Sequence, residues 1–201
     1  MSVKEETSLD PRVQRTLELL QQATMELLTE TGLRRLTVQD IAARAGINRA
    51  TFYAHFDDKY ALLDFMVRNR FEDALTARIP SPTEYTAENL RLLILAVCDF
   101  LGPFSEQCKK GAHIVQAEPM IEVRIQTCIY DVLYEWITAL LPADVDVSPG
   151  VAATTASWAI FGSVLRWSRE NRKLSAEQLV DQVLPLVMTG LAGVTRQSAV
   201  A

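Results

Sequence analysis

Apolar residues recur every three to four positions along almost the whole chain, which is the spacing of one face of an α-helix. Near the N-terminus, for example, this spacing is followed by Val13, Leu17, Leu20, Leu27 and Leu28. No useful length of sequence alternates polar and apolar residues with a period of two, as a half-buried β-strand would. The sequence therefore predicts an all-α protein.

The composition is that of a globular protein of the cell interior. The chain has 201 residues, of which 49% are hydrophobic, enough to bury a sizeable core. Its longest strongly apolar run, residues 92–98, is far shorter than the roughly 20 residues of a membrane span. Residues 1–12 are polar and lack the apolar stretch of a signal peptide. The three cysteines form no C-x-x-C pair, so we expect a cytoplasmic protein without a disulfide framework.

Capping residues and breakers divide the chain into helices. Asp10-Pro11 predicts a helix start and Gly32 its end. Two short helices follow, one from Thr37 to Ala45 and a second that starts at Asn48. Longer helices are predicted from Asp57-Asp58 to about position 79 and from Thr86 to a stop at Gly102-Pro103. The last three run from Pro119 to before Pro142, from Ser148 to about Asn171, and from Ser175 to about Thr195. A further segment over residues 104–115 is ambiguous, and Pro185 is expected to kink the last helix.

The segment TVQDIAARAGINRATFYAHF, residues 37–56, predicts a helix-turn-helix. Thr37 and Asn48 are suitable N-caps for two short helices, and Gly46 permits the sharp turn between them. Apolar side chains such as Ile41 and Phe52 can face inward, which leaves the polar residues of the second helix outside. A solvated amphipathic helix in an ordinary bundle would also be polar outside. The caps, the glycine turn and the aromatic positions together favour the helix-turn-helix.

The outer face of the second short helix carries side chains suited to DNA. Arg49 can make a bidentate contact to guanine, and Ala50 or the Thr51 methyl can touch a thymine methyl. Thr51, Tyr53 and His55 can donate hydrogen bonds to phosphate oxygens. Lys59 adds a cation at the start of the next helix.

The charge distribution supports a polyanion-binding face at the front of the chain. The whole chain has a net charge of −5, but residues 33–70 contain seven Lys/Arg against four Asp/Glu. Surface charges separated by more than about 10 Å are screened at 0.1 M salt, so this local excess matters more than the net charge.

Residues 33–63, LRRLTVQDIAARAGINRATFYAHFDDKYALL, resemble the DNA-binding domain of the TetR family of bacterial transcriptional regulators. The resemblance covers roughly residues 10–65. Two residues depart from the family pattern, because Asn48 stands where Ser is usual and Ala50 where Gly is frequent. The DNA-binding set implied by the resemblance, caps included, is Thr37, Val38, Gln39, Asn48, Arg49, Ala50, Thr51, Tyr53, His55 and Lys59.

The resemblance also implies an architecture and a mode of action. It implies an N-terminal three-helix helix-turn-helix domain, residues 1–57, and a larger C-terminal helical ligand-binding and dimerisation domain, residues 58–201. It further implies homodimers on palindromic operator DNA, and repression relieved by a small molecule. A constitutive or activating regulator without a ligand is the alternative.

The second half offers candidates for a ligand pocket and a dimer interface. Aromatic and other apolar residues that can line a pocket for an apolar or aromatic effector are Phe65, Cys98, Phe100, Phe104, Met120, Tyr130, Tyr134 and Trp136. Most residues of this kind are plain core, so the set is a hypothesis. Small residues at 4-3-4 spacing, which let two helices approach closely, are Ala152, Ala156, Ala159 and Ser163. Packing within the same chain would produce the same stripe.

The sequence contains no constellation typical of an enzyme. Neither metal-ligand spacing nor a glycine-rich phosphate loop is present, so we expect no metal and no cofactor. His113 is a lone histidine, and the cysteines are more typical of structural thiols than of oxidant sensors. Two rival classes remain: a helical enzyme using a carboxylate such as Glu118 or Glu122, and an architectural protein that binds DNA without sequence preference.

Overall fold

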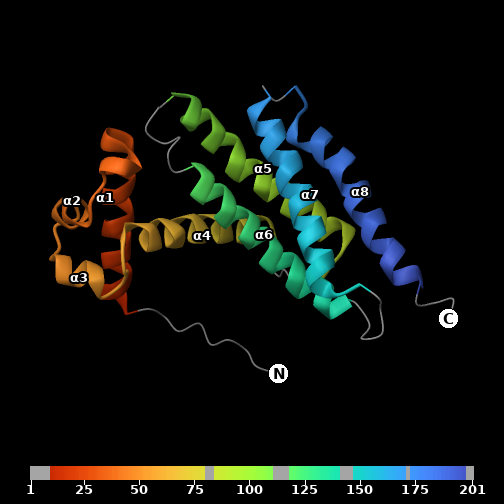
Figure 1. Ribbon diagram of the computed structural model, residues 1–201, viewed down its shortest axis with the longest axis horizontal. Coiled ribbons are helices and arrows are strands. Elements are labelled where there is room, and N and C mark those ends of the chain that lie inside the picture. Colours follow the sequence, from red (N-terminus) through yellow and green to blue (C-terminus); the bar gives the residue numbers. More distant parts are fainter. Residues whose placement is uncertain (1–9, 80–83, 111–117, 141–146, 171–172, 198–201) are drawn as a thin grey trace. The chain divides into compact units, whose positions relative to one another are not determined.

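The computed structural model describes residues 10–79, 84–110, 118–140, 147–170 and 173–197 (Figure 1). Its helices are α1 (Pro11–Arg35), α2 (Val38–Arg44), α3 (Arg49–Tyr53), α4 (Lys59–Arg78), α5 (Ala87–Lys110), α6 (Glu118–Leu140), α7 (Pro149–Arg169) and α8 (Ala176–Gln197). The described residues contain no β-strand. The predicted all-α class is therefore confirmed.

The described residues form two compact units. The first contains α1, α2, α3 and the start of α4 as far as Met66. The second contains the rest of α4, from Val67, together with α5, α6, α7 and α8. Helix α4 thus contributes residues to both units.

Most of the predicted helix starts are confirmed by side-chain caps. Asp10 accepts a hydrogen bond from the Arg12 amide at 2.9 Å, directly before Pro11. Asp58 accepts from the amides of Tyr60 and Ala61, both at 2.8 Å. The predicted capping box of α8 is complete, because the Ser175 amide donates to Gln178 Oε1 and the Gln178 amide donates to Ser175 Oγ. Each bond satisfies an amide that has no partner within the helix.

The stop predicted at Gly102-Pro103 is wrong, because α5 continues through both residues to Lys110. A residue that precedes proline normally avoids helical geometry, since its Cβ clashes with the proline ring. Gly102 has no Cβ, so this clash is relieved. The ambiguous segment is therefore helical over residues 104–110, and its remainder, including His113, lies outside the described residues.

The core of the first unit joins all of its helices. Fully buried side chains come from each: Leu20 and Ala23 of α1, Ile41 of α2, Phe52 of α3, and Leu62 of α4. Phe56, which follows α3, packs against Phe52 and Phe65 with ring centroids 5.9 and 5.3 Å apart. The two short helices are therefore held by hydrophobic contacts to longer ones, since helices of their length are not stable alone.

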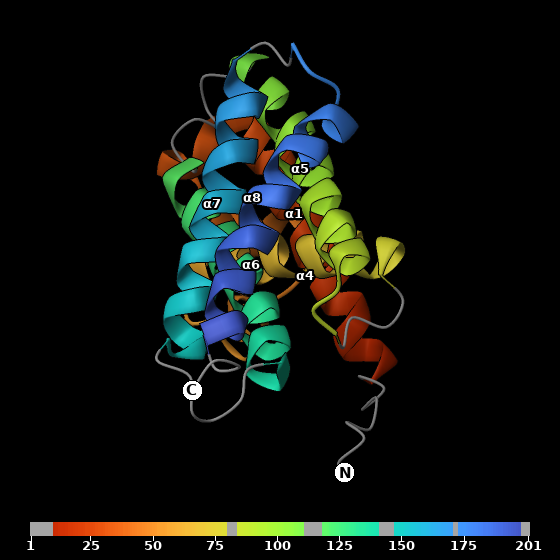
Figure 2. The same ribbon diagram turned by 90° about the vertical axis from the view of Figure 1, so that its right-hand side faces the viewer.

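In the second unit, α7 packs on α6 and lies beside α8 (Figure 2). The core of the second unit includes Ile94 of α5, Ile129 of α6, Ile160 of α7 and Val180 of α8. Polar contacts also link these helices: Gln126 Nε2 of α6 donates to Ser157 Oγ of α7 at 3.1 Å, and Arg91 of α5 pairs with Asp181 of α8 at 2.6 Å. No helix among the described residues is sufficiently long and apolar to span a membrane.

Candidate nucleic-acid interface

The turn between α2 and α3 is built on Gly46. The Gly46 amide donates to the carbonyl of Ala43 at 3.2 Å, and the Ile47 amide donates to the carbonyl of Ala42 at 3.0 Å. This pair of bonds is a Schellman motif, which requires a left-handed residue after the helix. Gly46 meets this requirement with φ of +67°. The predicted glycine turn is therefore confirmed.

We expect Gly46→Ala to destabilise the first unit by about 1 kcal/mol, the backbone cost of a left-handed L-residue. A Cβ at this position would meet no atom within 4 Å, so no steric clash adds to that cost. Gly46→Asn is the matched control and should cost less, because Asn tolerates this conformation. Urea unfolding followed by circular dichroism measures both. Equal stability of the Ala and Asn variants would contradict the assignment.

Thr37 caps α2 as predicted, but the capping box is incomplete. The Asp40 amide donates to Thr37 Oγ1 at 3.1 Å, as a capping box requires. The reciprocal contact differs, since the Thr37 hydroxyl donates to Asp40 Oδ2 at 2.6 Å. The Asp side chain, one methylene shorter than Glu, thus pairs with the hydroxyl of Thr37. The hydroxyl proton of Thr37 is consequently used inside the protein.

Helix α3 begins at the Asn48 cap, whose Oδ1 accepts from the Ala50 amide at 3.0 Å. Phe52 is fully buried and fixes the inner face, while Ile47, also predicted to face inward, is half-buried. Arg49, Ala50 and Tyr53 are exposed on the opposite side. The prediction that Phe52 faces inward and that Arg49, Ala50 and Tyr53 face outward is therefore confirmed.

The remaining predicted DNA-binding residues differ in exposure. Gln39 is exposed, and Val38, Thr51 and His55 are half-buried. The Arg49 side chain has no hydrogen bond or ion pair with any other described residue, so its guanidinium is available to a ligand. The rings of Phe52 and Tyr53 pack edge-on, with their centroids 5.6 Å apart. The exposed face of α3 thus combines a guanidinium that has no partner among the described residues with an exposed tyrosine.

Lys59, the last residue of the DNA-binding set implied by the resemblance, makes its side-chain hydrogen bonds inside the first unit. Its Nζ donates to the carbonyl oxygens of Leu33 and Leu36 at 2.9 and 2.8 Å. The ammonium also lies 5.2 Å from the centroid of the Tyr60 ring. The side chain is half-buried. Sequence patterns contain no sign of this contact, because the acceptors are main-chain atoms distant in sequence.

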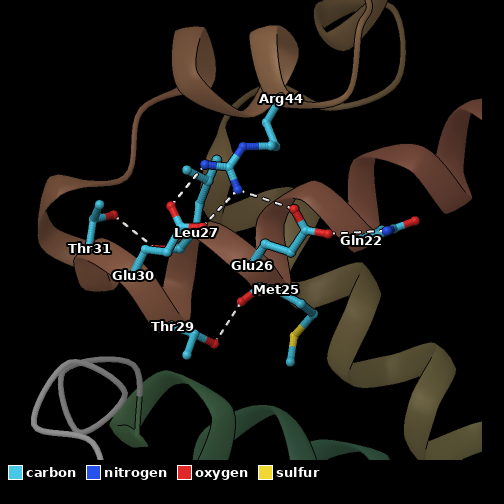
Figure 3. Close-up of polar contacts among 8 residues, drawn as sticks. All are labelled: Gln22, Met25, Glu26, Leu27, Thr29, Glu30, Thr31 and Arg44. Carbon is cyan, nitrogen blue, oxygen red and sulfur yellow. Dashed lines mark hydrogen bonds and ion pairs between the residues drawn. The ribbon is translucent and has the colours of Figure 1, made fainter.

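Arg44, a second cation of the helix-turn-helix, pairs with carboxylates of α1 (Figure 3). Its guanidinium donates to both Glu30 oxygens at 2.9 and 2.8 Å and to Glu26 Oε2 at 3.1 Å. The Arg44 hydrogen bonds lower the pKa of the Glu30 carboxyl. The charge excess counted over residues 33–70 includes Arg44, so two carboxylates of α1 offset part of it. Arg44 connects α2 to α1.

The predicted ligand-pocket residues occupy different environments. Phe65 belongs to the first unit and packs on Phe56. In the second unit, Cys98 and Trp136 are buried, and the half-buried Phe100 meets Phe71 at a centroid distance of 6.0 Å. Tyr130 is half-buried and stacks on Tyr134, which is exposed; Met120 is half-buried, and the Phe104 side chain lies outside the described residues.

Cys128 is buried, and burial raises the pKa of its thiol to about 11. Because the neutral thiol is favoured in the fold, we expect alkylation by iodoacetamide at pH 7.5 to be about 100-fold slower than in the urea-unfolded chain. Mass spectrometry of timed digests measures both rates at Cys128. Equal rates in the folded and unfolded chain would contradict this prediction.

The predicted dimer stripe of α7 is divided between two environments. Ala152 and Ala156 are buried within the chain, whereas Ala159 is exposed and Ser163 is half-buried. The exposed face of α7 also carries Trp158, which the sequence prediction left out of the stripe and which is 55% exposed.

An open groove of about 850 Å³ lies between α7 and α8 in the second unit. Its lining residues are Ser163, Arg166, Trp167, Glu170, Lys173, Leu174, Leu179, Gln182, Val183 and Leu186. Leu186 is 75% exposed, a large value for an apolar side chain. The described residues include no group of three or more His, Cys, Asp or Glu side chains that could hold a metal ion.

Comparison with known proteins identifies the helix-turn-helix. The family model for bacterial regulatory proteins of the tetR family matches residues 20–65. An uncharacterised helix-turn-helix transcriptional regulator, YxbF of Bacillus subtilis, is 37% identical over 87 residues, covering 41% of this chain and 23% of YxbF. The nucleoid occlusion factor SlmA of Pectobacterium carotovorum is 32% identical over 103 residues, covering 50% of each chain. The chain thus spans half or less of the length of these curated relatives.

Solved structures share the fold over nearly the whole chain. A putative transcriptional regulator from Pseudomonas aeruginosa has a TM-score of 0.56 at 23% identity and covers 94% of this chain and 96% of its own. FadR of Bacillus subtilis, solved in complex with stearoyl-CoA, has a TM-score of 0.53 at 19% identity and covers 86% of this chain and 98% of its own. At these identities the likeness concerns the fold.

Proposed function

We propose that this chain, whose residues 20–65 match the family model for bacterial regulatory proteins of the tetR family, is a homodimeric, sequence-specific repressor of transcription. The proposal rests chiefly on the exposed face of α3. There the Arg49 side chain makes no hydrogen bond or ion pair with another described residue, and Tyr53 is exposed and packs edge-on with Phe52. A short helix that enters the major groove places its N-terminal residues against base edges, which suits Arg49 at the first position of α3.

Selection of binding sites from random DNA tests this function. We expect enrichment of an inverted repeat, because a twofold dimer binds two equivalent half-sites. The half-site centres should be separated by about 34–36 Å, one helical turn, or a multiple of it. Absence of an enriched sequence despite retention of DNA would instead indicate an architectural DNA-binding protein.

We assign dimerisation to the exposed face of α7 and α8. Trp158 and Ala159 of α7 and Leu186 of α8 are exposed, and Leu186 lines the groove between the two helices. Monomeric proteins seldom expose contiguous apolar patches of large size, and a twofold axis matches such a patch with itself. Because Ala152 and Ala156 are buried within the chain, the proposed interface uses only the Ala159 and Ser163 end of the predicted stripe.

We further propose that an apolar or aromatic small molecule binds the second unit and releases DNA. The second unit contains an aromatic pair, the buried Phe71 of α4 and the half-buried Phe100 of α5. FadR, which shares the fold, was solved with stearoyl-CoA. Since α4 begins at Lys59 in the first unit, a ligand that moves this helix would alter the reading helices.

Thermodynamic linkage provides the test of ligand release. A ligand acts only through its different affinities for the two states, typically about 1–3 kcal/mol of coupling. Operator DNA must then weaken ligand binding by the same factor. Calorimetric titration of acyl-CoA and aromatic candidates, with and without the selected operator, measures this factor. A ligand that binds equally well in both titrations would identify a constitutive regulator.

A further inference from the structure

We propose that Lys59 is a positioning residue that braces the helix-turn-helix from inside, and that it binds no DNA phosphate. This inference rests on the proposed DNA-binding function. Lys59 is the first residue of α4, and its ammonium donates to the carbonyl oxygens of Leu33 and Leu36 at 2.9 and 2.8 Å. Two of its three N–H donors are therefore used within the protein.

The two acceptors lack the partners that a regular helix would provide. Gly32 has φ of +74° and ψ of 164°, so the helical geometry of α1 is interrupted just before Leu33. Carbonyls at the C-terminal end of a helix carry partial negative charge and need donors from elsewhere. The Lys59 ammonium supplies both donors at once, and hydrogen bonds from a charged donor are stronger than neutral ones.

The position of these contacts explains how they would act on DNA binding. Leu36 directly precedes Thr37, the cap of α2, while Lys59 begins the helix that follows α3. One ammonium thus ties the chain entering the helix-turn-helix to the helix that leaves it. Loss of this tie would let α2 and α3 move relative to α1, which affects sequence recognition more than general attraction to DNA.

Salt-dependent binding distinguishes positioning from phosphate contact. A phosphate ligand supports non-specific binding too, and its loss flattens the plot of log affinity against log salt by about 0.9 per contact. For Lys59→Met we expect operator affinity to fall at least about tenfold, because two charge-assisted hydrogen bonds are lost. Affinity for a shuffled duplex, and its salt dependence, should stay at the wild-type values.

Arg49→Met is the matched control, since it removes a cation that has no partner among the described residues. Its affinity for the shuffled duplex should fall and its salt plot should flatten. A flattened plot for Lys59→Met would identify a phosphate ligand and overturn the proposal. Unchanged operator affinity for Lys59→Met would overturn it as well.

Hydrogen exchange without DNA provides a second measurement. The Ile41 amide donates to the Thr37 carbonyl at 3.1 Å, and its exchange should accelerate in Lys59→Met while remaining unchanged in Arg49→Met. Unaltered exchange would count against positioning.

If Lys59→Met fails to fold, that supports an internal role, because a phosphate ligand is dispensable without DNA. In that case the binding assays use Lys59→Arg, which keeps the charge and the hydrogen-bond donors. Its operator affinity and its salt dependence should match the wild-type values. A flattened salt plot for Lys59→Arg would overturn the proposal. A wild-type chain without operator preference would refute the proposed function but leave the exchange result standing.

Discussion

Replacement of Leu186 by Arg is expected to convert the proposed dimer into folded monomers and to weaken operator binding by roughly 10²–10⁴-fold. That range is the usual gain from linking two binding modules, which the monomer loses. Leu186 is 75% exposed and lines the groove between α7 and α8, so Arg at this position has room in the isolated chain. Across a twofold interface, however, its charge would be buried without a partner, at high cost.

Val123→Arg is the matched control for this prediction. Val123 is also apolar and 65% exposed, but it lies on α6 and does not line the groove. Its replacement should leave the dimer intact. Sedimentation velocity measures the assembly of both variants, and circular dichroism verifies their helicity. A dimeric Leu186→Arg variant would place the interface on a different surface.

The proposed dimer interface on α7 and α8 illustrates how much the spacing of small residues can predict. Small residues at 4-3-4 spacing indicate that α7 can approach another helix closely, but spacing does not specify whether that helix belongs to the same chain or to a second copy. Ala156 turned out to be buried within the chain, next to Ser157, which bonds to Gln126 of α6. Trp158, one turn from Thr155 and two turns from Val151 on the exposed side, was not included in the predicted stripe, because aromatic residues on an apolar helix usually belong to the core.

Local chemistry made the helix starts predictable. Asp10, Thr37, Asn48 and Ser148 all cap the helices predicted for them, because capping joins residues only two or three positions apart. The turn at Gly46 was predictable for the same reason. The stop at Gly102 failed because glycine, normally a helix breaker, here removes the Cβ that would have made proline incompatible with the helix.

The partners of the cations in the helix-turn-helix were not predictable. Arg44 pairs with Glu30 and Glu26 of α1, and Lys59 bonds to main-chain carbonyls more than 20 residues away. Such contacts depend on how the helices cross, which the core determines. The sequence therefore identified the basic residues of this region but could not separate those that face DNA from those that hold the fold.

Arg49→Ala should have a large effect on sequence recognition. A bidentate arginine contact to guanine discriminates by about 1–3 kcal/mol. A dimer makes the contact once in each half-site, so operator affinity should fall by about 2–6 kcal/mol, or roughly 30-fold to 10⁴-fold. Preference for one base pair should disappear at the same position of both half-sites. Competition binding against a complete set of single-substituted operators measures this.

Two control variants separate the chemistry of Arg49 from its charge. Arg49→Lys keeps the cation but loses the planar fork, so it should retain affinity for shuffled DNA and still lose the base preference. Tyr53→Phe removes only a hydroxyl suited to phosphate, and should weaken binding to all the operators about equally. If Arg49→Ala likewise weakens every operator by the same factor, Arg49 contacts the backbone. The base contact must then come from a different residue of α2 or α3, with Gln39 the exposed candidate on α2.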